Sequence, residues 1–413
     1  MANSLLTTQI IVREALVQLE NNLVAAKLVN RRYEKDYSKA KNGNTIRVRR
    51  PIRYNVRTGA TMVPQDTEEG NISVTVDKQR GVDLQFSSVD MTLTIEEFSA
   101  RYLKAGMMEL AQYIDADILA LYYKVPNWVG ATTETVDTYS DYTRGAERLD
   151  QLAVPAGDRV GILHTTDHWG LVRSLSGIYV EKRAESAIKN AEIGMLADTA
   201  TYKSQNIAIH TTGTWSGSPV CNTSTAPTTY AAAKATTPLQ QTLAVTGAST
   251  GVTGYAKAGD VITIVGVNDI NPRNYANLGR LKQFTVLADA DSDGGGAVSL
   301  TISPAIITSG PYRNCVISSA GSGKALVPFG AAAATNRANL VMHKDALGLV
   351  MVPMELPAGA VNPARETYKD ISARLIPVYD GTNDYNQWRL DVLYGVEAYY
   401  PEMATRLCGT SGS

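Results

Sequence analysis

The stretch from Lys41 to Arg57 constrains this chain most, because it is basic and alternates like a β-strand. It reads KNGNTIRVRRPIRYNVR, in which Ile46, Val48 and Ile52 are interleaved with arginines. A second strand-like stretch, ISVTVDKQRGVDLQFS, follows an acidic, turn-rich segment, so the pattern predicts a two-stranded ribbon. An isolated ribbon is marginal in water, since two strands cannot cover both of their faces. We therefore expect the ribbon to lie on a neighbouring subunit, which points to assembly rather than catalysis.

Length and charge set broad bounds. A chain of 413 residues predicts two or three domains, and its formal net charge of -1 provides no global field for polyanions. The N-terminus lacks the pattern of a signal peptide, and no apolar run approaches the ~18–20 residues needed to cross a bilayer. Cys221, Cys315 and Cys408 are odd in number and far apart, which fits a reducing cytosol. We expect a soluble protein made inside a cell, with no membrane partner.

Two helices are predicted in the first third of the chain. The first has a threonine cap at position 7 or 8, and its apolar residues recur at helical spacing to about Arg32. The second opens with a capping box, Thr94 and Glu97, and continues to Tyr123. About thirty residues at 1.5 Å each make a rod of roughly 45 Å. Such a length suits a structural spine.

The composition changes twice after residue 143. Residues 143–211 mix helical and short apolar strand patterns, which is typical of an α/β or α+β module. Residues 212–324 contain 12 charged residues among 113, against 67 in the other 300, and carry strand patterns at LAVTG, DVITIVGV, QFTVLA, AVSLTI and CVISS. Short strands at this spacing predict a small antiparallel barrel or sandwich. The mixed pattern returns after Lys324, so we predict an all-β domain inserted into a host domain.

No spacing in the chain predicts a catalytic or metal site. Residues 289–295 read DADSDGG, like the start of a calcium loop, but Leu300 stands where a bidentate glutamate is required. We therefore predict a hairpin tip there. Asp115 and Asp117 on the second helix cannot share a face, being two residues apart, and are predicted to be surface charges. The sequence predicts no metal, no cofactor and no enzymatic activity.

The strongest charge signal is the row of arginines in the predicted ribbon, with no acidic residue from Lys41 to Arg57. Three interpretations stay open: a solvated face that discourages edge aggregation, direct contact with nucleic acid, and salt bridges to an adjacent identical subunit. The third draws on acidic residues of the same projecting arm. The candidate inter-subunit residues are Arg47, Arg49, Arg50, Arg53, Arg57, Asp66, Glu68 and Glu69.

Four short stretches resemble a known family. They are AKNGNTIRVRRP (residues 40–51), GDVITIVGVNDI (259–270), HKDALGLV (343–350) and LDVLYGVEAYYPEMATRLCG (390–409). With the order of elements along nearly the whole chain, they make the sequence similar to the P22-type coat proteins, a branch of the HK97-type major capsid proteins of tailed bacteriophages. The resemblance implies an α+β, HK97-type capsid fold with N-arm, E-loop, P-domain with a spine helix, and A-domain, and with an inserted all-β barrel domain.

The resemblance also implies domain boundaries. They are 1–41 for the N-terminal helical arm, 42–90 for the E-loop, 91–142 for the P-domain with its long spine helix, 143–211 for the first part of the A-domain, 212–324 for the inserted antiparallel β domain, and 325–413 for the return of the A-domain with the C-terminal strands. A shell of this kind changes shape as DNA enters, and the predicted places to bend are Gly43, Gly59, Gly70 and Gly106.

The function implied by the resemblance is that of a major capsid protein, which self-assembles into hexamers and pentamers of an icosahedral shell. Its implied partners are a scaffolding protein, a portal and non-specifically packaged double-stranded DNA, with assembly in the cytoplasm of a bacterial host. Two other classes stay open. One is an encapsulin-like compartment shell, against which the inserted β domain counts, and the other is a monomeric β-rich binding module or enzyme.

The basic ribbon generates a first prediction. Replacing Arg49 and Arg50 together by glutamate is expected to leave a folded monomer that assembles poorly, because attraction between copies becomes repulsion. Electron microscopy of the purified double variant measures this. Particles of normal form would show that the ribbon arginines are not needed for assembly.

Overall fold

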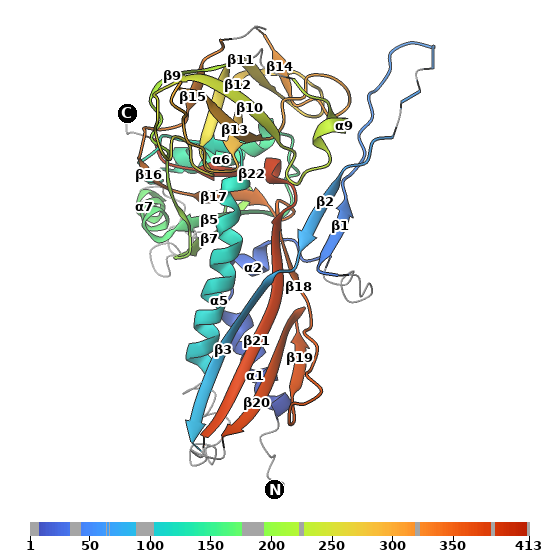
Figure 1. The fold of residues 1–413 in the computed structure, drawn as a ribbon, viewed down its shortest axis with the longest axis vertical. Coiled ribbons are helices and arrows are strands. Elements are labelled where there is room, and N and C mark those ends of the chain that lie inside the picture. The colour runs from blue at the N-terminus through green and yellow to red at the C-terminus, as the bar shows by residue number, and fades with distance from the viewer. Residues whose placement is uncertain are drawn as a thin grey trace. The chain divides into compact units, whose positions relative to one another are not determined.

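The protein is described by a computed structural model, which covers residues 8–33, 43–62, 64, 65, 67–87, 103–175, 194–222, 227–318, 323–380 and 385–410. It divides into two compact units (Figure 1). The first unit comprises residues 1–46, 73–118 and 348–397, and the second comprises residues 47–72, 119–347 and 398–413. Each unit is thus built from segments far apart in the sequence.

A five-stranded sheet forms the body of the first unit. Its strands follow the order β18 (Leu347–Met351), β21 (Tyr385–Ala398), β20 (Ile371–Asp380) and β19 (Ala364–Tyr368), and β3 (Lys78–Ser87) also pairs with β21. The β3–β21 pairing is antiparallel and extends over ten residue pairs, from Tyr385 opposite Ser87 to Tyr394 opposite Lys78. Helix α1 (Thr8–Asn22) packs against β19 and β20.

The predicted single helix to about Arg32 is wrong, because α1 ends at Asn22 and a short helix α2 (Ala25–Leu28) follows. The backbone N–H groups of Val24 and Ala26 donate to the Asp115 carboxylate at 2.7 and 3.0 Å. A side chain thus takes the place of the preceding helical turn as acceptor, and the helix restarts there. Asp115 is 2% exposed, so its prediction as a surface charge is also wrong.

The predicted spine helix is present over its described part. Helix α5 (Lys104–Leu119) continues into a 3₁₀ helix, η3 (Ala120–Lys124), which ends one residue beyond the predicted Tyr123. The predicted start, with the capping box of Thr94 and Glu97, lies outside the described residues.

A mixed six-stranded sheet forms one part of the second unit. Its order is β4 (Asn127–Val129), β22 (Ala404–Leu407), β17 (Asn339–His343), β5 (Arg159–His164), β7 (Thr199–Ser204) and β6 (Met195–Leu196). The β22–β4 and β5–β7 pairs are parallel and the others are antiparallel. Helices α6 (Tyr139–Gln151) and α7 (Thr165–Leu175) contribute to its core with residues such as Tyr142, Leu149 and Leu171. The mixed character predicted for residues 143–211 is confirmed.

Residues 212–324, predicted as an all-β insert, contain the short helix α9 (Tyr230–Ala233) and six strands of a seven-stranded antiparallel sheet, whose seventh strand lies just beyond that range. The order is β14 (Cys315–Ile317), β11 (Val261–Ile270), β12 (Asn277–Val286), β13 (Val298–Ser303), β10 (Gln241–Ala248) and β9 (Gly217–Cys221), and β15 (Leu326–Pro328) also pairs with β11. Its five sequence-predicted strands are all present. One isolated antiparallel bridge, Val220 to Ala325, joins the two outer strands β9 and β15. The sheet encloses its own apolar core, which includes Leu243, Phe284 and Leu300.

Buried charges connect this sheet with α6. The guanidinium of Arg148 on α6 lies 2.5 Å from the carboxylate of Asp269 on β11, and both side chains are 0% exposed. The ammonium of Lys282 on β12 donates to the same carboxylate at 2.9 Å. Burial by itself raises the pKa of Asp269, but the charges of Lys282 and Arg148 outweigh it and hold the pKa below its ordinary value.

A second buried cation lies at the start of the same sheet. Arg406 on β22 donates to the carbonyl of Val125 at 2.6 and 3.0 Å and to the carbonyl of Gly259, immediately before β11, at 2.5 Å. Burial lowers the pKa of Arg406 to about 10, so the guanidinium keeps its charge at neutral pH.

The Asp269 cluster generates a second prediction. Asp269→Asn leaves Arg148 buried without its counter-charge and is expected to lower the free energy of unfolding by ~3–5 kcal/mol, measured by chemical denaturation. The exposed Arg49–Glu69 pair supplies the control, since Glu69→Gln should cost only ~0–1 kcal/mol.

The same cluster predicts a pH dependence. Because the folded-state pKa of Asp269 is depressed, its contribution to stability is complete above the unfolded-state value of about 3.9 and is lost as the pH falls through the folded pKa. Equal acid sensitivity of wild type and Asp269→Asn would contradict this role.

Candidate inter-subunit surface

The predicted ribbon is only partly present, because the second half of its predicted second strand forms β3, which pairs with β21 instead. Strands β1 (Thr45–Arg49) and β2 (Asn71–Thr75) form a two-stranded sheet. Hydrogen bonds of 2.8 Å close it at both ends, from Arg50 N–H to the Gly70 carbonyl and from Val76 N–H to the Asn44 carbonyl. Val48 is buried between the exposed Arg47 and Arg49, as the alternation predicted. Beyond Arg49 the ladder stops, and the described residues between 51 and 69 belong to a long loop (Figure 1).

Side-chain bonds hold the two arms of this loop together. The Gln65 amide accepts from the backbone N–H of Asn55 at 2.8 Å and donates to its carbonyl at 2.7 Å. Large apolar side chains on the same loop face water: Val56 is 96% exposed, Met62 77% and Tyr54 56%. The loop is therefore ordered by polar contacts while its apolar groups have no core of their own.

The five candidate arginines separate into two environments. Arg47, Arg49, Arg53 and Arg57 are exposed. The guanidinium of Arg49 pairs with Glu69 at 3.5 Å, and that of Arg57 donates to the carbonyl of Gly59 within the loop. Exposed pairs of this kind contribute little to stability.

Arg50 differs from the other four, because it is only 8% exposed. Its guanidinium approaches the Glu402 carboxylate at 3.9 Å and the Tyr399 carbonyl at 3.4 Å, both in its own chain. Strand alternation puts Arg50 on the same face as Val48, opposite Arg49, and this face is buried here.

The acidic candidates are distributed unevenly. Glu69 is exposed and pairs with Arg49, whereas Glu68 is half-buried and its carbonyl accepts a hydrogen bond from the Tyr312 hydroxyl at 2.9 Å. Asp66 lies outside the described residues.

The four glycines named as places to bend also differ. Gly43 (φ +70°) and Gly59 (φ +96°) have a left-handed backbone and open surroundings, so only glycine is unstrained there. A Cβ on Gly106 would lie 3.0 Å from Val82 Cγ1, and one on Gly70 would collide with the Tyr230 hydroxyl. Close packing therefore explains why glycine stands at positions 70 and 106. Bending at all four glycines remains a prediction.

Nothing at the other sites resembles catalytic chemistry. The carboxylates of Asp289, Asp291 and Asp293 accept backbone N–H groups at 2.6–2.8 Å, as expected of a hairpin tip. Across the described part of the chain, no group of three or more His, Cys, Asp or Glu side chains is placed to hold a metal ion. Within the same residues, no helix has the length and apolarity required to span a bilayer.

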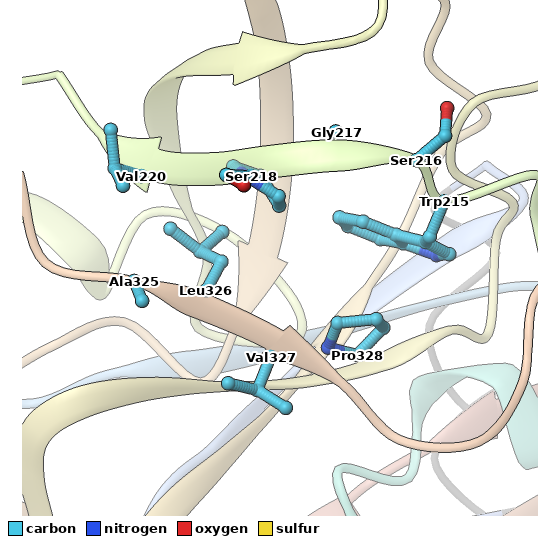
Figure 2. A pocket seen from close by; sticks show the side chains of 10 residues that line it. Trp215, Ser216, Gly217, Ser218, Val220, Ala325, Leu326, Val327 and Pro328 are labelled. Atoms are coloured by element: carbon cyan, nitrogen blue, oxygen red, sulfur yellow. The ribbon is translucent and has the colours of Figure 1, made fainter.

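A cavity of about 300 Å³ opens between β9 and β15, where a single bridge joins the two strands. Figure 2 shows Trp215 and Pro328 on opposite sides of it, with Leu326 and Val220 further along. Its lining residues are Trp215–Val220 and Ala325–Pro328, none of which carries an acidic or basic side chain. General acid–base chemistry has no group to use there.

Comparisons with known proteins point the same way. The family model described as "P22 coat protein - gene protein 5" matches residues 1–409. The major capsid protein of Acyrthosiphon pisum secondary endosymbiont phage 1 is 23% identical over 434 aligned residues, which cover 99% of this chain and 100% of the relative.

Two solved structures from phages also match this chain, at low sequence identity. A structure from Mycobacterium phage Che8 has a TM-score of 0.47 and 12% identity, covering 93% of this chain and 90% of its own. The capsid structure of Cyanophage P-SCSP1u has a TM-score of 0.43 and 11% identity, covering 90% and 85%.

A match along almost the entire chain defines the class as a structural protein of the phage virion. The chain belongs to the P22 coat protein family, and it is a major capsid protein. The exposed ribbon and loop are therefore surfaces of a capsid subunit.

Burial of Arg50 changes the first prediction. Arg50→Glu brings a second carboxylate beside Glu402 in a buried position, so it should destabilise the folded chain by several kcal/mol rather than leave it intact. Arg49→Glu, at a side chain that is 82% exposed, should change stability by no more than ~0.5 kcal/mol. Thermal unfolding of the two single variants measures the difference, and equal stability would contradict the inward placement of Arg50.

Proposed function

We propose that copies of this chain form hexamers and pentamers of an icosahedral shell around double-stranded DNA. The main support for this proposal is that the apolar side chains of Tyr54, Val56 and Met62 are exposed on one loop. Burying such side chains on a partner stabilises by roughly 1.5–3 kcal/mol each, which their own chain does not provide. A neighbouring copy is the partner that a self-assembling shell supplies.

The proposed architecture is the HK97-type capsid fold. Residues 42–90 act as the E-loop, and α5 with β19, β20 and β21 forms the P-domain, since these elements share the first unit. The six-stranded mixed sheet with α6 and α7 is the A-domain, and residues 1–41 are the N-terminal arm.

The inserted domain at residues 212–324 is proposed to be a closed barrel. Strands β9, β10, β13, β12, β11 and β15 follow one another by pairing, and the Val220–Ala325 bridge returns from β15 to β9. The backbone bond from Cys221 N–H to the Lys324 carbonyl, 2.9 Å, supports this closure. Closing a sheet removes edges that would otherwise pair with other chains.

The proposed partners follow from a role in the shell. They are further copies of the chain, a scaffolding protein, a portal and packaged DNA held without sequence preference. We propose assembly in the cytoplasm of the bacterial host and no enzymatic activity. Individual contacts between exposed charges are weak, so closure depends on many copies acting together.

Charge on the loop tip tests this proposal. Val56→Asp with Met62→Asp should leave the unassembled chain as stable as wild type, because both side chains are exposed, and raise the concentration needed for assembly at least ~10-fold. Light scattering and electron microscopy measure the yield of particles. The conservative pair Val56→Ile with Met62→Leu is the control and should assemble normally. Undiminished assembly of the aspartate pair would contradict the proposal.

A further inference from the structure

The root of the exposed loop is held by the inserted domain of the same chain. The Tyr312 hydroxyl accepts from the backbone N–H of Arg53 at 3.1 Å and donates to the carbonyl of Glu68 at 2.9 Å. Arg53 and Glu68 lie on opposite arms of the loop, so a single hydroxyl bridges both arms. Thr237 adds a bond of 3.3 Å to the Asn71 carbonyl.

The Tyr312 ring is itself immobilised. It stacks on Tyr230 with ring centroids 3.6 Å apart and planes within 6° of parallel. Tyr230 lies at the start of α9 (Tyr230–Ala233; Figure 1). Its side chain is 6% exposed and packs in a small core with Ala305 and Ile307. Because the stack restricts the ring, the Tyr312 hydroxyl is held in place before the loop contacts it.

Gly70 allows the loop to approach this pair. A Cβ at that position would collide with the Tyr230 hydroxyl. Burial raises the pKa of Tyr230 to about 12, so this hydroxyl stays neutral at physiological pH. The close approach is therefore a contact between uncharged groups.

The hydrogen bonds from the inserted domain engage the loop through its backbone. They use the N–H of Arg53 and the carbonyls of Glu68 and Asn71, while the Arg53 side chain remains exposed. A cavity of about 320 Å³ lies beside them, lined in part by Asn55, Gln65 and Ser309. Side-chain packing between loop and insert is thus incomplete beside the hydroxyl bridge.

We propose that Tyr312, held by Tyr230, is a positioning residue that fixes the path of the loop relative to the seven-stranded sheet in the second unit. The inserted domain then sets the geometry of the inter-subunit contact, a consequence that rests on the shell function proposed above. The backbone path is fixed at the root, and the side chains of the tip stay available to a neighbouring copy.

Tyr312→Phe tests the proposal, since it removes the hydroxyl and keeps the stacked ring. In the unassembled full-length chain, hydrogen exchange at residues 53–57 should become ~5–10-fold faster, because the Arg53 amide loses its acceptor. Tyr275→Phe is the matched control: its hydroxyl donates to the Pro311 carbonyl at 3.0 Å within the insert, and exchange in the loop should not change. Gly70→Ala should accelerate loop exchange like Tyr312→Phe, by displacing Tyr230.

Assembly rate gives the second readout. Tyr312→Phe should assemble more slowly than wild type and Tyr275→Phe, with a main thermal transition that is unchanged. If the loop of Tyr312→Phe exchanges its amide hydrogens at the wild-type rate, the proposal is overturned. Faster exchange with an unaltered assembly rate would overturn it as well. Failure of the wild-type chain to form shells would refute the shell function. Hydrogen exchange in unassembled chains would still test whether Tyr312 positions the loop.

Discussion

A hydroxyl bridge supports the most exposed part of this capsid protein. A two-stranded ribbon with a long loop cannot bury its own apolar groups, so its direction has to be set from outside. Tyr312 supplies that support by bonding the backbone of both arms, and Arg50 adds a buried contact near Glu402. Since these contacts lie at the root, Val56 and Met62 remain exposed at the tip. The loop is thus directed by its own chain, and its exposed tip is the part that we propose contacts another copy.

The seven-stranded sheet is anchored by buried charges. The sequence of residues 212–324 is poor in charge, yet Asp260, Asp269 and Lys282 are buried. Asp269 and Lys282 form a cluster with Arg148 on α6, and Asp260 accepts hydrogen bonds from His210 at 2.9 Å and from Trp215 at 2.7 Å. Breaking a buried pair is costly, so these groups hold the sheet against α6. A firmly attached sheet can in turn hold the loop.

Sequence patterns predicted much of this fold, because the strands and helices concerned depend on local periodicity. The ribbon, the strands of the insert and helices α6 and α7 were all predicted in this way. Failures occurred where a distant residue decides the outcome. Asp115 interrupts the first helix from 89 and 91 positions away, and Tyr312 reaches the loop across 244 and 259 positions. Arg50 was grouped with the exposed arginines as one charged row, although alternation places it on the face of Val48. Its partner Glu402, near the other end of the chain, could not be identified from the local pattern.

The central claim is that the exposed loop completes its packing on a different copy of the chain. A density map of the assembled particle, at a resolution that displays side chains, tests this most directly. We predict that Val56 and Met62 lie buried against a neighbouring subunit, while Arg53 and Glu68 keep their backbone bonds to Tyr312 of their own chain. A map in which the loop tip faces solvent, or folds onto its own subunit, would contradict the claim.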